Sequence, residues 1–337
     1  MGALPVKAKA GTANTCSSGP ANGVAVHADT STSMRAGIEM GTDPDVRLGA
    51  GAGLPGRRLQ RPRLRSVASA VVSHAVLIAG ALVMVVPFIW MLSTSLKPTG
   101  DVLGYSLDLI PRPPMWDNYV KVWQSLPFAR YFWNSLVVSS TVTLLQLATC
   151  SMAAYAFARL RFPGRDTLFL LYLGTLMIPG QVTMIPNFIL VRLLGWQDTY
   201  MALILPEAFS AFGTFLLRQF FLTIPAELED AAKIDGCSWS RVYASVILPL
   251  AKPALAALAI FTFMGQWNNF LWPFIVTSSE QMKTLTVGLR SFQGMYYTDW
   301  NLLMAGSLIS LVPILVVFFL AQEHFIKGIA LTGMGGR

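Results

Sequence analysis

The chain of 337 residues is 54% hydrophobic and only 12% charged, with a mean hydropathy of +0.54 and a net charge of +8. Soluble domains carry about 25% charged residues, so this composition excludes an ordinary soluble domain and indicates a membrane protein. Five positive charges lie together before the first hydrophobic stretch, at Arg57, Arg58, Arg61, Arg63 and Arg65. Such a cluster is more typical of a membrane topology signal than of a nucleic-acid site, and no nucleic-acid partner is expected.

The remaining composition excludes several chemistries. Cys16, Cys150 and Cys237 are far apart and form no CxxC pair, so they predict neither a disulfide framework nor a metal site. The sequence has no Gly-Lys-Ser nucleotide loop and no His/Asp/Ser constellation. We therefore expect a non-catalytic chain that binds no cofactor and does not hydrolyse ATP by itself.

Residues 1–66 are rich in Ala, Gly, Ser, Thr and Arg and show no apolar periodicity. Such a segment buries too little surface to offset the entropy of ordering, so a disordered tail is expected. No apolar core follows Met1, so the tail is not a secretory signal.

Six apolar stretches follow in residues 67–337, each near the roughly 20 residues that cross about 30 Å of hydrocarbon. Each must be helical, because lipid offers the backbone no hydrogen-bond partner. The fold class expected is therefore an all-α polytopic membrane protein with six transmembrane helices. The expected spans are 67–94, 134–158, 167–190, 199–221, 252–276 and 302–322. Prolines within or near them are expected to kink several helices: Pro87, Pro179, Pro186, Pro206, Pro273 and Pro313.

The basic residues predict the topology. With a cytoplasmic N-terminus, the inside flanks hold twice as many Lys and Arg residues as the outside flanks. The positive-inside rule therefore places both termini and the 222–250 loop in the cytoplasm.

The third and fourth spans contain polar residues next to prolines. Residues 179–186 are expected to break the third helix twice, and freed carbonyls at such breaks tend to line protein or a cavity. Gln181 and Thr183 are thus candidate pathway residues. Glu207, beside Pro206, is an intramembrane carboxylate, although we expect it near the outer interface.

The polar segment 222–250 predicts two short amphipathic helices separated by a glycine. Glu227, Glu229 and Asp230 fall in the first turns of the first helix, where carboxylates favour the positive end of the helix dipole. Apolar residues fall on or near one face of this helix: Leu228, Ala231, Ala232 and Ile234.

Gly236 can adopt the left-handed conformation that ends a helix. Ser238 is a candidate N-cap for the second helix, and Pro249 is expected to stop it. One interpretation of the whole segment is an amphipathic loop resting on the bilayer. Interfacial helices are usually rich in Lys and Arg, whereas three acids precede Lys233 here, which favours a protein partner.

Three runs have a distinctive spacing: Glu229-Asp230-Ala231-Ala232, then Ile234-Asp235-Gly236, then after nine residues Val246-Ile247-Leu248-Pro249. Together they resemble the EAA loop of permease subunits of ATP-binding-cassette (ABC) importers, with Asp230 in place of the usual Glu and Val246 in place of the usual Ile. In that family the loop is the coupling helix that docks into the cytoplasmic ATPase. The resemblance implies an ATPase-coupling role for Glu229, Asp230, Ala231, Ala232, Asp235, Gly236, Leu248 and Pro249.

The fifth span ends in a polar cluster formed by Gln266, Trp267, Asn268 and Asn269. Amides at membrane depth tend to face a bundle interior or a cavity. They could bind sugar hydroxyls while the indole stacks on a pyranose ring, or they could hold helices together. Both interpretations stay open.

This cluster, together with the W-x-N-Y segment Trp116–Tyr119 and residues 285–289, looks like the carbohydrate-uptake branch of the family, whose members resemble the maltose importer. The likeness covers about residues 67–337. It implies a second homologous permease, two ABC ATPase subunits that hold ATP and Mg, and an extracytoplasmic solute-binding protein. The outer loop 277–300 would reach that protein, or be a plain connector. The contact candidates are Ser291, Phe292, Gln293, Gly294, Met295 and Tyr296.

The expected function is therefore that of a permease subunit in a bacterial cell membrane, importing a mono- or oligosaccharide. A glycerol-3-phosphate or polyol importer would have the same architecture, but it would favour cations along the pathway, and none is placed well inside a span. A secondary transporter is a remote alternative, since it would need inverted repeats and intramembrane acids for ion coupling.

Overall fold

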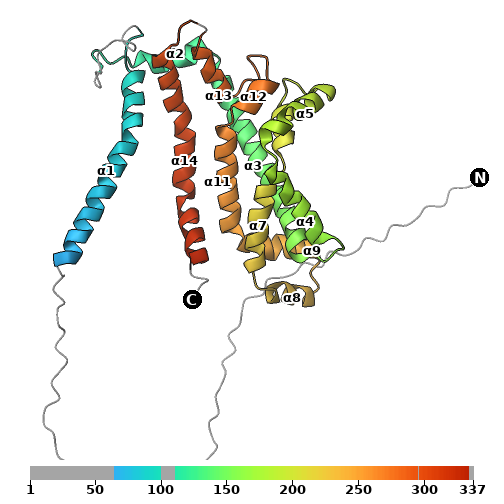
Figure 1. Cartoon of the computed structure of the whole chain (residues 1–337). Helices are drawn as coiled ribbons and strands as arrows, with labels where there is room; N and C mark the ends of the chain where they lie inside the picture. Colours follow the sequence, from blue (N-terminus) through green and yellow to red (C-terminus); the bar gives the residue numbers. More distant parts are fainter. Residues whose placement is uncertain (1–63, 100–110, 295, 334–337) are drawn as a thin grey trace, which may run out of the picture. The chain divides into compact units, whose positions relative to one another are not determined.

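The structure is a computed structural model that describes residues 64–99, 111–294 and 296–333 (Figure 1). The tail expected over 1–66 lies outside the described residues as far as residue 63, and residues 64–66 already belong to the first helix. Among the described residues, three helices are long and apolar enough to cross a membrane as single spans. They lie within α1 (Leu64–Ser95), α3 (Phe128–Arg159) and α14 (Trp300–Gly333).

Three further helix pairs are apolar enough to cross the membrane as broken spans, so the described part of the chain contains as many as six spans, the number expected. The first pair, α4 (Arg165–Gly174) with η1 (Thr175–Met177) and then α5 (Gly180–Leu193), is bent by 98°. The second, α6 (Tyr200–Ile204) with η2 (Leu205–Glu207) and then α7 (Ala211–Thr223), is bent by 41°.

Prolines explain where these two spans break. The prediction of a second break in the third span, at Pro186, is wrong. Pro179 precedes α5 and Pro206 lies in η2, both at the bends. Pro186 instead lies inside α5, which continues through it. A proline removes one backbone hydrogen bond, but its fixed φ near −65° is helical, so the helix tolerates it here.

The fifth expected span, 252–276, is also broken. α11 (Lys252–Trp267) is 16 residues long, or about 24 Å at 1.5 Å per residue, and α12 (Leu271–Val276) follows it. The break falls at residues 268–270, within the amide cluster and before Pro273. The third apolar pair differs from the expected span, because it joins residues 239–250 to α11 with a bend of 78° at the other end of α11.

The described helices pack in the order α1, α14, α11, α3 and α7 (Figure 1). α8 (Glu227–Ile234) lies at one end of this bundle, called here the α8 end. α2 (Asp117–Ser125) and α13 (Leu285–Leu289) lie at the opposite, α2 end. α1 begins and α14 ends toward the α8 end.

The W-x-N-Y segment joins α2 to the end of α1. Asn118 is 1% exposed, and its Nδ2 donates to the carbonyl oxygens of Ser95 at 2.8 Å and Lys97 at 3.0 Å. The Tyr119 hydroxyl lies 2.9 Å from Ser95 Oγ. The segment thus packs the start of α2 against the end of α1, while Trp116 is exposed.

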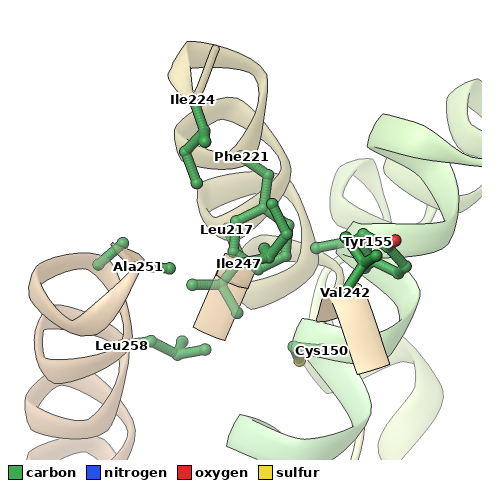
Figure 2. Packing of buried hydrophobic residues seen from close by; sticks show 11 residues of the cluster. Cys150, Tyr155, Leu217, Phe221, Ile224, Val242, Ile247, Ala251 and Leu258 are labelled. Atoms are coloured by element: carbon green, nitrogen blue, oxygen red, sulfur yellow. The ribbon is translucent and has the colours of Figure 1, made fainter. Parts of the chain in front are cut away.

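A buried hydrophobic cluster fixes the α8 end (Figure 2). It combines Leu217 and Phe221 of α7 with Val242, Ile247 and Leu258, which come from three successive parts of residues 239–267. Because these side chains interdigitate, the segment after α8 packs on α7 and on the start of α11 at once. This arrangement makes the 222–250 segment part of the bundle rather than a loose loop.

Candidate functional site

The glycine between the two short helices of the 222–250 segment has the expected conformation. Gly236 has φ +80°. Its N–H donates to the Lys233 carbonyl at 2.9 Å, and the N–H of Cys237 donates to the Ala232 carbonyl at 2.9 Å. This is the bonding pattern of a Schellman C-cap, which ends α8 and reverses the chain.

The second helix differs from its prediction at both ends. Ser238 occupies the N-cap position of α9 (Trp239–Val242), but its side chain makes no capping hydrogen bond and lies 3.1 Å from Ser240 Oγ. Pro249 does not stop the helix, because it lies inside the next turn, α10 (Leu248–Leu250). The turn before it, η3 (Tyr243–Ile247), is a π-helix. A proline cannot donate to the carbonyl four residues earlier, and the widened turn accommodates this missing bond.

The orientation of α8 places a charge inward and apolar groups outward. Glu229 is 4% exposed, whereas Leu228 is 44% and Ile234 86% exposed. Ala231 is exposed as well, and only Ala232 packs against the buried cluster. The expected apolar face is therefore displayed at the surface.

Arg159, the last residue of α3, holds Glu229. Its Nε lies 2.8 Å from Glu229 Oε1, an ion pair whose N–H direction does not satisfy hydrogen-bond geometry. Its Nη2 donates to the carbonyl oxygens of Phe221, at 2.6 Å, and of Ile224. The Phe221 carbonyl also accepts from the N–H of Ile224 at 3.2 Å, so one guanidinium binds the last turn of α7 and joins it to α3 and α8.

Arg159 is the last of three polar contacts along one face of α3, here called the α3 ladder and formed by Ser151, Tyr155 and Arg159. Ser151 Oγ lies 2.7 Å from the Tyr243 hydroxyl, and the Tyr155 hydroxyl donates to the Trp239 carbonyl at 3.4 Å. Their spacing of four residues puts all three on one side of the helix. The sequence prediction missed this ladder, although the spacing of polar residues at the end of an apolar span could have indicated it.

Of the remaining candidates of this segment, Asp230, Asp235 and Pro249 are exposed and Leu248 is half-buried. Asp230 is exposed and 3.7 Å from Lys233 Nζ, a surface pair worth little stability. Lys233 Nζ lies 3.7 Å above the Trp239 ring. Asp235 is the C-cap of α8.

A second site is a polar hollow of about 390 Å³ between α5, η2 and the start of α12. Five polar residues line it: Gln181, Thr183, Asn187, Glu207 and Asn269. Three of these were expected from the sequence as pathway residues, and they come from spans far apart in the chain. Asn187 was missed, although it lies one turn from Thr183 on the same helix face.

The other members of the fifth-span cluster lie outside the lining of this hollow. Gln266 lies behind it, with Nε2 donating to Glu207 Oε2 at 3.1 Å. Asn268 is exposed and donates to the carbonyl of Met264. Trp267 is 2% exposed, packs edge-on against Phe132 and donates from Nε1 to the Ser310 carbonyl. The indole offered as a stacking surface is thus part of the hydrophobic core.

Glu207 contacts α3 and α11 within the bundle, and its expected position near the outer interface stays a prediction. Its carbonyl accepts a 2.7 Å hydrogen bond from Gln146 Nε2, and Gln146 is near the middle of the 32-residue α3. Gln266 is about 21 Å of helix rise from Lys252 at the start of α11. The first contact lies near the middle of α3, and the second lies at the end of α11 that precedes α12.

The outer-loop candidates form a tight turn. Gln293 bridges to Thr298, and the N–H of Gly294 donates to the Tyr297 carbonyl at 2.9 Å. Tyr296 is 94% exposed at the tip, and Ser291 is also exposed. Phe292 is 5% exposed and belongs to a core cluster, so it supports the turn from below. Met295 lies outside the described residues.

The helical spans, the outward-facing α8 and a polar hollow at mid-bundle define a membrane transport subunit. Residues 147–331 match the family described as "Binding-protein-dependent transport system inner membrane component". The chain belongs to this family: it is the multi-pass inner-membrane permease component of an ABC importer. Permeases of this family are non-catalytic and carry no cofactor, and ATP is bound by a partner ATPase.

Similar proteins are named after different solutes. The sn-glycerol-3-phosphate transport system permease protein UgpE of Yersinia enterocolitica is 37% identical over 265 residues, covering 76% of this chain and 94% of that protein. The arabinooligosaccharides transport system permease protein AraQ of Bacillus subtilis is 36% identical over 260 residues, covering 76% and 92%. A solved bacterial ABC transporter that imports the acidic polysaccharide alginate has the same fold, with a TM-score of 0.70 at 24% identity over 79% of this chain and 99% of that chain.

Proposed function

We propose that the chain translocates a sugar delivered by an extracytoplasmic binding protein, within a complex of two homologous permeases and two ABC ATPases. The polar hollow supports a sugar, because its amide and hydroxyl side chains can both donate to and accept from solute hydroxyls. The name of AraQ supports it as well. The permease domain is residues 67–337, preceded by a cytoplasmic tail.

The observation that carries the coupling role is the orientation of α8. A helix that buries its acid and exposes Leu228 and Ile234 presents an apolar surface that needs a partner. The α3 ladder holds this surface on the bundle, so movement of the partner is transmitted to α3. In this proposal α8 and both termini are cytoplasmic, and ATP-driven closure of the ATPases moves the 222–250 segment to rock the helices.

Two exposed positions test this arrangement. Cysteines replace Ile234 and Tyr296 separately in a chain whose native Cys16 and Cys237 are serine. A membrane-impermeant maleimide should label Tyr296→Cys in intact cells and Ile234→Cys only after permeabilisation. A short cross-linker at Ile234→Cys should capture the ATPase, and Tyr296→Cys is the matched control. Labelling of Ile234→Cys in intact cells would contradict the proposal.

A second candidate is import of glycerol-3-phosphate, which the 37% identity to UgpE favours; a polyol importer would have the same architecture. Calorimetric titration of the cognate binding protein separates these solutes. We expect binding of an arabinooligosaccharide rather than of sn-glycerol-3-phosphate or glycerol. Binding of the phosphate ester instead would replace the sugar assignment and leave the coupling role intact. A secondary transporter is excluded by the family.

The surface tip of the outer loop is the proposed contact for the binding protein. Ser291, Gln293, Gly294 and Tyr296 are exposed there, and the buried Phe292 anchors the turn. Replacing Tyr296 with Ala should weaken stimulation of the ATPase by the loaded binding protein while leaving basal ATP hydrolysis unchanged. Unchanged stimulation would remove this loop from the contact.

A further inference from the structure

Glu207 is an acidic residue in the lining of the polar hollow. The proposed coupling of the 222–250 segment to the ATPase does not involve it. Within the described part of the chain, the ten residues that line this hollow include one carboxylate and no Lys, Arg or His. The other polar groups are amides and a hydroxyl. The lining therefore has an acid as its one ionisable group, and it is negatively charged when that acid is ionised.

The contacts of Glu207 leave most of its carboxylate available. Gln266 donates one hydrogen bond to Oε2, whereas an ionised carboxylate can accept about four. A residue that only held helices together could be an amide, which avoids the cost of placing an acid at membrane depth. The acid instead faces the hollow and is fixed there by Gln266 and by the bond between Gln146 and the Glu207 carbonyl.

The surroundings explain how this charge acts on a solute. Gln181 and Thr183 on α5 and Asn269 beyond α11 are within the same hollow, so a polyhydroxylated solute would meet hydrogen-bonding groups on several sides. A carboxylate accepts strong hydrogen bonds from hydroxyl groups. The same charge repels an anion, and the repulsion is poorly screened inside a membrane protein.

We propose that Glu207 is a specificity-determining residue that makes the hollow admit uncharged polyhydroxylated solutes and exclude anionic ones such as sugar phosphates. This inference rests on the proposed sugar function and narrows its substrate class. One relative is named for glycerol-3-phosphate and another for arabinooligosaccharides. The inference favours the uncharged oligosaccharide as the class of solute.

The test measures the charge of the hollow directly, using the assembled permease–ATPase complex. Thr183→Cys is introduced with Cys16 and Cys237 replaced by serine, and the 1% exposed Cys150 retained. Its reaction rates are measured with two methanethiosulfonates of similar size, the cationic trimethylammonium-ethyl and the anionic sulfonatoethyl reagent. We expect the cation to react roughly 10-fold faster relative to the Tyr296→Cys control, as one charge several Å away produces.

Variants of Glu207 assign the selectivity to this side chain. In Glu207→Gln the ratio should fall to that of the control, and in Glu207→Asp it should persist. A ratio that Glu207→Gln leaves unchanged would overturn the inference, as would failure of Thr183→Cys to react with either reagent. Co-purification of the ATPase verifies that each variant is assembled.

Transport completes the test. Vesicles carrying the complex and its binding protein are supplied with an arabinooligosaccharide or with sn-glycerol-3-phosphate. ATP-dependent uptake of the phosphate ester by the wild type would contradict exclusion of anions, whatever the thiol rates show. Loss of ATP dependence would instead overturn the proposed function and leave the charge measurement valid, so the two failures are distinguishable.

Discussion

Removing the carboxylate of Glu229 should detach α8 from the bundle. The side chains of Glu229 and Arg159 are 5% and 11% exposed, and breaking a buried ion pair by removing one partner costs about 3–5 kcal/mol. In Glu229→Ala the guanidinium keeps the carbonyl oxygens of Phe221 and Ile224. We therefore expect the lower part of this range, about 3 kcal/mol.

Hydrogen exchange of α8 in the purified complex measures this cost. Since 1.36 kcal/mol is tenfold in an equilibrium constant, local opening of α8 should increase on the order of 100-fold. Solute transport should fall while ATP hydrolysis persists. Glu227→Ala, which removes an exposed acid from the same helix, should change exchange by less than about threefold, because surface substitutions stay within about 0.5 kcal/mol.

A double variant separates the charge from the shape of this site. Arg159→Gln with Glu229→Gln leaves no unpaired buried charge, and its amides can still bond carbonyls. It should exchange more slowly than Glu229→Ala. Exchange of α8 in Glu229→Ala within about twofold of the wild type would refute the reasoning, because Arg159 would then not hold the helix.

Three other changes have defined outcomes. Gly236→Ala meets free space but must adopt φ +80°, at a cost of about 1–2 kcal/mol; the ATP hydrolysed per solute transported should rise, and Gly236→Asn should do less harm. Gly288→Ala would put its Cβ 2.1 Å from the Tyr131 ring, an overpacking that should cost about 1–3 kcal/mol and lower the Tm of the complex, whereas Gly180→Ala, with open space around it, should not. Burial alone raises the pKa of Asp198, but hydrogen bonds from Ser279 and from the backbone outweigh it and hold this pKa below its usual range. The stabilisation is therefore present above about pH 4 and is lost as the pH falls further; hydrogen exchange at residues 277–279 should increase there, and Asp198→Asn should show the same increase at neutral pH.

The sequence predicts much of the fold because the lengths of apolar runs and the residues that begin and end helices are local properties. The six spans follow from apolar runs, and the end of α8 follows from Gly236. Rules based on the local sequence fail where the surrounding structure offsets an unfavourable residue. Pro186 and Pro249 lie inside helices, since packing and a widened turn offset one missing backbone hydrogen bond.

The contacts that make the sites depend on residues far apart in the chain. Arg159 and Glu229 are 70 positions apart, and nothing in their spacing pairs them. The position of Glu207 depends on Gln146 of another helix. Trp267 stands within the polar cluster, but helical geometry turns it away from its neighbours and into the core. Composition identifies such residues, and only the packing decides which way they face.

The same helix that carries the α3 ladder also contacts the broken fourth span. Gln146 bonds to the Glu207 carbonyl and Thr149 to that of Ala208, about 20 Å and about 15 Å of helix rise from Arg159. As a continuous helix, α3 therefore keeps its contacts at Arg159 and at Gln146 at a fixed separation. A tilt of about 10° imposed at Arg159 would displace Gln146 by about 3.5 Å, more than a hydrogen bond can stretch. A small displacement of α8 would thus be enough to break the hydrogen bond between Gln146 and the turn that carries Glu207.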